Sequence, residues 1–168
     1  MKRLIFLFAM ILFGLVQVGY FVGCSVSGKG RPDLVVVAFE TRGAVTLDKE
    51  NRAVVPLHVA VKNRGGAEAG VFKIAVMYTS ADGPRFAHFL VKGQTNPRYV
   101  QTRGILKPDT EFVFNGTVVF HPSEQGMIVP MYAVVDSCNG ERDMPSYCRV
   151  DESNEKNNQS EPISITLP

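Results

Sequence analysis

Along most of the chain, apolar and polar side chains alternate with a period of two residues, which is the spacing of a β-strand and not of a helix. The segment 54–63 shows this best, because every second residue from Val55 to Val61 is apolar and His58 falls on the opposite face. The same alternation predicts strands over 33–39, 54–63, 72–78, 85–92, 112–120, 127–136 and 163–167.

Turn-forming residues separate these segments, for example Gly65-Gly66 and Asp82-Gly83-Pro84. No helical pattern follows residue 31. About seven short strands joined by turns are typical of an antiparallel β-sandwich, with a closed barrel as the alternative. Segment 85–92 is the weakest strand, because it is apolar on both faces.

The alternation also predicts which side chains form the core. In segment 127–136 we expect the odd positions from Val129 to Val135 to point inward and Asp136 to point outward. Other side chains expected to face inward are Phe72, Ile74, Val76, Tyr78, Phe112, Phe114, Val118 and Phe120.

The first 24 residues have a different pattern. Lys2 and Arg3 precede an apolar run over 4–22, and Gly23-Cys24 follows it. A basic start, an apolar run and a small residue before a break are typical of an export signal. The segment resembles a bacterial lipoprotein signal, although Phe21 stands where such signals usually have Leu. This resemblance implies that Cys24 becomes the lipidated first residue of the mature protein.

An uncleaved membrane anchor is the alternative, because the apolar run is long for a signal and adequate for a spanning helix. Both interpretations keep Lys2 and Arg3 in the cytoplasm and place everything after Gly28 outside it. We therefore expect a signal or anchor over residues 1–23, a Gly-rich linker over 24–31 and one β-sandwich domain over 32–168.

The charge of the exported part is close to zero. The chain has 18 Lys and Arg and 16 Asp and Glu, and two of the basic residues lie in the signal. A neutral exported chain is not expected to bind nucleic acid.

Three cysteines fit an oxidising compartment. With Cys24 lipidated, Cys138 and Cys148 remain as an even pair, and we predict a disulfide between them. Two reduced thiols are the alternative.

Several segments together resemble the CARDB family. They are Pro32-Asp33-Leu34-Val35-Val36, Val61-Lys62-Asn63-Arg64-Gly65, Leu106-Lys107-Pro108, Val135-Asp136 and Glu152-Ser153-Asn154-Glu155-Lys156-Asn157-Asn158. The resemblance implies an Ig-like, fibronectin-like β-sandwich of an extracellular protein with a role in adhesion. The cysteine-bounded loop between Asp136 and Asp151 departs from the family pattern.

An acidic, amide-rich segment spans residues 136–161. Hard cations such as calcium prefer several carboxylate and carbonyl oxygens from flexible loops. The candidate calcium ligands are Asp136, Asp151, Glu152, Glu155 and Asn157. Alternatively, these side chains only cap backbone groups of the loop. No other cofactor is expected.

A basic segment, residues 83–107, contains no Asp or Glu. It could bind an acidic glycan, a lipid headgroup or an acidic protein surface, or it could be an edge strand guarded by its cations. The candidate binding residues are Arg85, Lys92, Arg98, Tyr99 and Arg103.

Catalysis has little support in the sequence. His58, His88 and His121 are scattered along the chain, and no nucleophile, zinc or phosphate-loop motif occurs. We expect a membrane-anchored, non-catalytic binding or adhesion module of the bacterial cell envelope, outside the cytoplasm and, in a Gram-negative source, at the outer membrane or periplasmic face. The alternative is a structural accessory subunit of an envelope or secretion assembly. The expected partners are the membrane, through the lipid, and an envelope protein or glycan.

Overall fold

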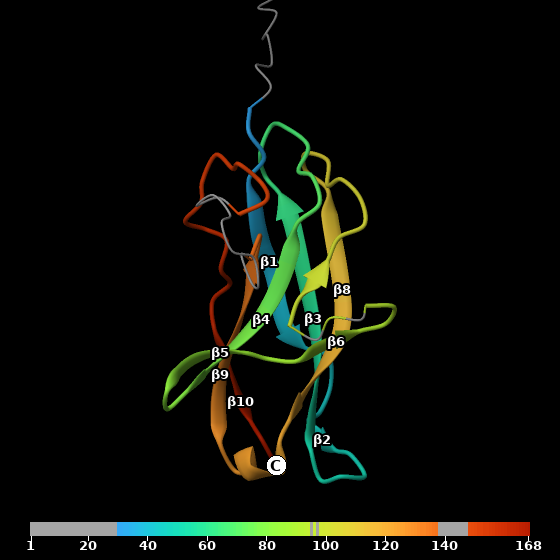
Figure 1. Ribbon diagram of the computed structural model, residues 1–168, viewed down its shortest axis with the longest axis vertical. Coiled ribbons are helices and arrows are strands. Elements are labelled where there is room, and N and C mark those ends of the chain that lie inside the picture. The colour runs from blue at the N-terminus through green and yellow to red at the C-terminus, as the bar shows by residue number, and fades with distance from the viewer. Residues whose placement is uncertain (1–29, 95, 97, 138–147) are drawn as a thin grey trace, which may run out of the picture.

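The computed structural model describes residues 30–94, 96, 98–137 and 148–168. These residues form two antiparallel sheets that pack face to face (Figure 1). The prediction of an antiparallel β-sandwich is therefore confirmed. Cys24, Cys138 and the rest of residues 1–29 and 138–147 lie outside the described residues. Within the described residues, no helix is long and apolar enough to cross a membrane.

The first sheet has the order β1-β3-β8-β6, and β2 also pairs with β3. Its strands are β1 Leu34–Thr41, β2 Thr46–Leu47, β3 Ala53–Asn63, β6 Phe89–Val91 and β8 Glu111–Phe120. The longest pairing joins β3 to β8 without a register shift from Ala53 opposite Phe120 to Lys62 opposite Glu111.

The second sheet has the order β10-β9-β4-β5, and β7 also pairs with β4. Its strands are β4 Lys73–Ser80, β5 Gly83–Phe86, β7 Val100–Gln101, β9 Ile128–Val135 and β10 Ile163–Thr166. A short 3-10 helix, Pro122–Glu124, precedes β9, and the His121 ring accepts a hydrogen bond from the backbone at its first turn.

The expected strand over 85–92 is two strands in two different sheets. β5 pairs with β4, whereas β6 pairs with β8. Ala87, between them, is buried, and its N–H donates to the carbonyl of Val76 at 2.8 Å. The chain crosses from one sheet to the other here, which explains why this segment is apolar on both faces.

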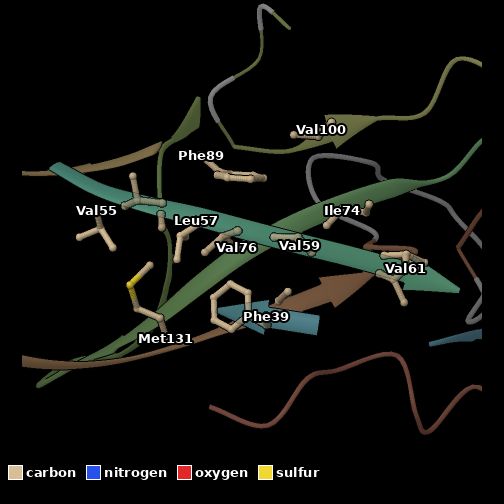
Figure 2. Packing of buried hydrophobic residues seen from close by; sticks show 14 of the residues in the cluster. Phe39, Val55, Leu57, Val59, Val61, Ile74, Val76, Phe89, Val100 and Met131 are labelled. Atoms are coloured by element: carbon tan, nitrogen blue, oxygen red, sulfur yellow. The ribbon is translucent and has the colours of Figure 1, made fainter. Parts of the chain in front are cut away.

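The core lies between the sheets (Figure 2). The alternating residues of β3 expected inside, from Val55 to Val61, are at most 1% exposed. The predicted inward residues of β9, from Val129 to Val135, are also buried. Burying one such side chain contributes about 1.5–3 kcal/mol, so the alternation itself drives the two sheets together.

The prediction that Asp136 points outward is wrong. Asp136 is only 4% exposed. It follows the last residue of β9 and has a positive φ of 46°, so the strand alternation no longer determines the direction of its side chain.

Candidate functional site

Buried polar side chains gather at one end of the sandwich, where β1 begins and β3 and β9 end. Residues 148–160 run beside this end, next to the start of β1 (Figure 1). Backbone hydrogen bonds attach them there, from Ser153 N–H to Pro32 and from Val135 N–H to Asn158, both at 2.8 Å. We call the buried Asp136 and Glu152, the partly buried Asn157 and Asn158 and the exposed Glu155 beside them the Glu152 cluster.

Glu152 is the most buried member of the cluster, with 2% exposure. One of its carboxylate oxygens accepts a hydrogen bond from the backbone N–H of Leu34, and the other accepts from Asn158 Nδ2 at 2.8 Å. Burial is the main reason why the pKa of Glu152 is raised to about 8, with the charges of Glu155 and Asp136 adding to it. Glu152 thus joins residues 148–160 to the first strand.

Asp136 has a similar role at the end of β9. Its Oδ2 accepts hydrogen bonds from the N–H groups of Arg149 at 3.1 Å and Val150 at 2.9 Å. Burial raises its pKa to about 6, against the opposing effect of these two donors. The nearby charge of Glu155 also raises it.

The remaining members connect the cluster to its surroundings. Glu155 Oε1 accepts from the N–H of Glu152 at 2.9 Å, and Asn157 Nδ2 donates to Asp33 Oδ1 at 2.8 Å. Three buried oxygen atoms have no hydrogen-bond partner among the described residues: Asp136 Oδ1, Asn157 Oδ1 and Asn158 Oδ1. Buried acceptors without partners are costly, so these three oxygens are the atoms here to which a cation or a water could bind.

The structure brings together four of the five candidate calcium ligands and leaves out Asp151. The Asp151 side chain is half exposed and forms an ion pair with Arg31 at 3.0 Å. Among the described residues, no three His, Cys, Asp or Glu side chains are grouped as a metal site. Backbone N–H groups donate most of the hydrogen bonds that the cluster's side chains form with described residues, in agreement with a capping role, and calcium binding stays a prediction.

Sequence reasoning missed two residues of this end. Asn158 was overlooked beside Asn157, although its backbone carbonyl and its amide both hold the segment in place. Asn63 is fully buried at the end of β3 and uses its amide in four hydrogen bonds, to Asp33, Gly65, Ala67 and Leu106. The available signal in the sequence was an Asn at the end of a predicted strand, directly before the turn at Gly65-Gly66.

The candidate basic residues divide between two places. Lys92 and Arg103 line a groove of about 320 Å³ that has Phe112 and Phe114 in its wall, and Arg103 and Tyr99 line a neighbouring hollow of about 250 Å³. Arg85 lies apart on β5, in an ion pair with Asp82.

Tyr99 and Arg98 have local roles beside these hollows. The ring of Tyr99 packs against Lys73, whose Nζ lies 4.3 Å from the ring centre and whose side chain is buried. The backbone N–H of Arg98 donates to Asn96 Oδ1 at 2.9 Å. The basic residues therefore do not form one continuous patch.

Two of the three histidines line one cavity. His88 and His121 lie in the wall of a space of about 410 Å³, together with Tyr78 and Glu124. The Tyr78 hydroxyl donates to Glu124 at 3.2 Å, and burial raises the pKa of Tyr78. His121 is engaged with Ser123 at 2.9 Å, and His58 lies elsewhere, beside Asn115 on the outer face of the first sheet. In this cavity Tyr78 and Glu124 are therefore hydrogen-bonded to one another.

Comparison with known proteins identifies the fold. No protein-family model and no curated protein matches this chain. Among solved structures, a CARDB domain from Pyrococcus furiosus, crystallised in complex with di-metal ions, matches with a TM-score of 0.51 and 23% identity over 82% of this chain and 90% of that one. The chain has a CARDB-like fold.

This CARDB-like fold agrees with the resemblance carried by segments such as Val61-Lys62-Asn63-Arg64-Gly65. A β-glucosidase from Kluyveromyces marxianus also matches, with a TM-score of 0.37 and 13% identity over 83% of this chain and 14% of that one. That second likeness is too weak to say anything about activity.

Proposed function

We propose that this chain is a non-catalytic binding module held at the outer side of a membrane by its N-terminus. The observation that carries the proposal is a CARDB-like sandwich directly after a signal-like segment that ends in Gly23-Cys24. CARDB modules present loops and sheet surfaces rather than a reaction centre. The binding surface, not a catalytic group, is then the functional part of the molecule.

Under this proposal Cys24 carries the lipid and the linker 24–31 keeps the sandwich near the membrane. The described chain begins at the end of the sandwich that carries the Glu152 cluster, and its C-terminus lies at the opposite end (Figure 1). A linker of this length spans at most about 29 Å when fully extended. The end with the Glu152 cluster is therefore the membrane-proximal one in the proposed arrangement.

The anchor is tested by the intact mass of the protein purified from membranes and by a Cys24→Ser variant. Lipidation predicts a mature chain that starts at residue 24 with an added acyl mass, and more than one chain for stable anchoring. The Cys24→Ser variant should then not be processed in this way. A chain that retains Met1 and an unmodified Cys24 contradicts lipidation and favours the uncleaved anchor.

The binding role is tested by crosslinking the full chain in its envelope and purifying it. Retention on envelope glycan or on the cell surface supports the adhesion module. A single stoichiometric protein partner supports the accessory subunit. This second function is favoured by one edge of β8, where β6 pairs only with residues 116–118.

We also propose weak calcium binding at the Glu152 cluster. The support is chemical. One carboxylate oxygen of Asp136 and the amide oxygens of Asn157 and Asn158 are buried without a partner in the part of the chain that the structure describes, and hard cations prefer such oxygens. The Pyrococcus furiosus CARDB domain was crystallised with di-metal ions. With one orphaned carboxylate oxygen, we expect an affinity in the millimolar range, at about 10⁻⁴–10⁻³ M.

Melting curves in calcium and in chelator test this part. A calcium concentration about ten times the Kd should add about 1.4 kcal/mol, which raises the melting temperature by about 3–6 °C. Asp136→Asn should abolish the calcium-dependent difference. Asp151→Asn is the matched control, because Asp151 is paired with Arg31 outside the cluster, and it should keep the difference. Equal melting temperatures in calcium and chelator for the native chain would leave only the capping role.

A further inference from the structure

β8 has a strand neighbour along the whole of one edge but along only part of the other. On one side β3 pairs with all of β8, from Glu111 to Phe120. On the other side β6 pairs only with residues 116–118. Within the described residues, no strand pairs with this second edge over residues 111–115. We call this stretch the open edge of β8.

The open edge results from the early end of β6. β6 stops at Val91, and Gly93 follows with a φ of 80°, a conformation that favours glycine and turns the chain away from β8. The next strand, β7, pairs with β4 in the other sheet. The groove lined by Lys92 and Arg103 therefore lies beside β8 where a longer β6 would continue.

Three other outer strands, β1, β10 and β5, carry features that discourage pairing with a further strand. β1 has a register irregularity between Val36 and Ala38, which bends its edge. β10 lies between Pro162 and Pro168, and β5 contains Pro84. The open edge of β8 contains no proline or glycine and keeps a regular register with β3. Its backbone is therefore suited to receive a partner strand.

The groove beside the open edge combines an apolar floor with a basic rim. Phe112 and Phe114 of β8 and Val91 of β6 supply the apolar part, and all three are only partly buried against the core. Lys92 and Arg103 are exposed at the groove, and Arg103 is held in place by a hydrogen bond to the Gly93 carbonyl at 2.8 Å. No Asp or Glu side chain lines the groove.

We propose that the open edge of β8 binds an extended, acidic peptide segment of a partner protein by strand addition. The main chain of the peptide pairs with residues 111–115, an apolar side chain enters the groove over Phe112 and Phe114, and acidic side chains meet Lys92 and Arg103. Five paired residues correspond to about 17 Å of strand, so the recognised segment is short. The inference deepens the proposed binding function, on which it rests, by naming the chemistry of the partner.

A synthetic peptide of alternating Asp and Val, about seven residues long, is the probe. It is titrated by fluorescence anisotropy against the full chain in detergent micelles. We expect saturable binding that weakens as salt rises from about 50 mM to about 500 mM, because the rim charges are exposed. Replacing Lys92→Glu and Arg103→Glu together should weaken binding about tenfold. Lys49→Glu with Lys156→Glu, an equal charge change at two exposed positions outside the groove, is the control and should leave binding unchanged.

The backbone requirement separates strand addition from simple charge attraction. The same peptide with N-methyl groups at alternate residues keeps its charges but loses the N–H donors that pair with a strand, so it should bind at least about tenfold more weakly. Equal binding of the two peptides overturns the proposal. Binding of polygalacturonate through Lys92 and Arg103 without binding of the peptide also overturns the proposal, because the groove would then be a glycan site. Either failure leaves the anchor at Cys24 untouched, because intact mass tests it separately.

Discussion

At the scale of single residues, buried polar side chains fix the loops at the end of the sandwich that carries the Glu152 cluster. Asn63 is the strongest example. Its Oδ1 accepts from the N–H groups of Asp33 at 3.1 Å and Gly65 at 3.0 Å, and its Nδ2 donates to the carbonyls of Ala67 at 2.7 Å and Leu106 at 3.0 Å. One side chain thus connects the start of β1 to two turns.

We predict that Asn63→Ala lowers the free energy of unfolding by about 3 kcal/mol, because buried backbone groups lose their partner. Urea denaturation measures the change. Asn154→Ala is the control, since Asn154 is exposed and accepts a hydrogen bond from the N–H of Lys156 alone among the described residues, and it should cost less than about 1 kcal/mol. Equal losses in the two variants would contradict the role of Asn63.

The raised pKa values of Glu152 and Asp136, about 8 and about 6, predict an unusual pH dependence of the metal-free protein. For a carboxyl whose pKa is raised by folding, the folded state holds a proton that the unfolded state releases. The associated stability is full below the unfolded pKa, near 4.5 for Glu152, and is lost as the pH rises through about 8. In chelator, the free energy of unfolding should therefore fall between about pH 4.5 and 8.

A Glu152→Gln variant checks the origin of this slope. Gln carries no ionisable proton, so the fall in stability over this range should become smaller in the variant. Glu161→Gln, at an exposed position, should leave the slope as it is in the native chain. A native chain that gains stability over the same range would show that the pKa values of Glu152 and Asp136 are not raised.

The direction of individual acidic side chains could not be predicted from the sequence. Asp151 and Glu152 are neighbours of equal charge, yet one pairs with Arg31 in solvent and the other is buried against Leu34. Neighbouring side chains of an extended segment point to opposite sides, but the segment alone does not say which side is inside. That choice is made by the N–H of Leu34 at the start of the first strand, which donates to the Glu152 carboxylate.

At the scale of elements, the period-two pattern predicted six strands, β1, β3, β4, β8, β9 and β10, and the inward set of β3. It could not predict β2 and β7, because two residues are too short to show a period. It also predicted β5 and β6 as a single strand, whereas the two strands pair in different sheets. Phe112 and Phe114, expected in the core, are only partly buried because the edge beside them is open.

Gly116 of β8 tests how β6 is attached to the first sheet. A Cβ added at Gly116 would lie 2.5 Å from the Leu90 carbonyl oxygen and 2.7 Å from Phe89 Cε2. Gly116→Ala should therefore push β6 away and cost about 2 kcal/mol. Hydrogen exchange should show faster exchange in β6, whereas Gly70→Ala, with nothing within 4 Å of the added atom, should leave it unchanged. Unchanged exchange in Gly116→Ala would mean that β6 adapts without separating.

At the scale of the whole molecule, residues 148–160 join both sheets at the membrane-proximal end of the proposed arrangement. Glu152 holds them to β1 in the first sheet, and Asp136, after β9 in the second, accepts from Arg149 and Val150. Val150 itself belongs to the core, with 5% exposure. The segment therefore acts as a cross-connection between the layers, and whatever restricts its freedom in the unfolded chain stabilises the whole sandwich.

The predicted disulfide between Cys138 and Cys148 would impose such a restriction. Cys148 is 8% exposed and lies just before the residues that Asp136 holds, while Cys138 lies outside the described residues. Closing so short a loop removes conformational freedom from the unfolded state, so Cys138→Ala with Cys148→Ala should lower stability by about 3 kcal/mol. Reductant should destabilise the native chain by a similar amount and leave the variant unaffected. Peptide mapping without reduction, on protein taken from the envelope, decides the pairing: two free thiols there would leave Glu152 and Asp136 as the connection between the sheets.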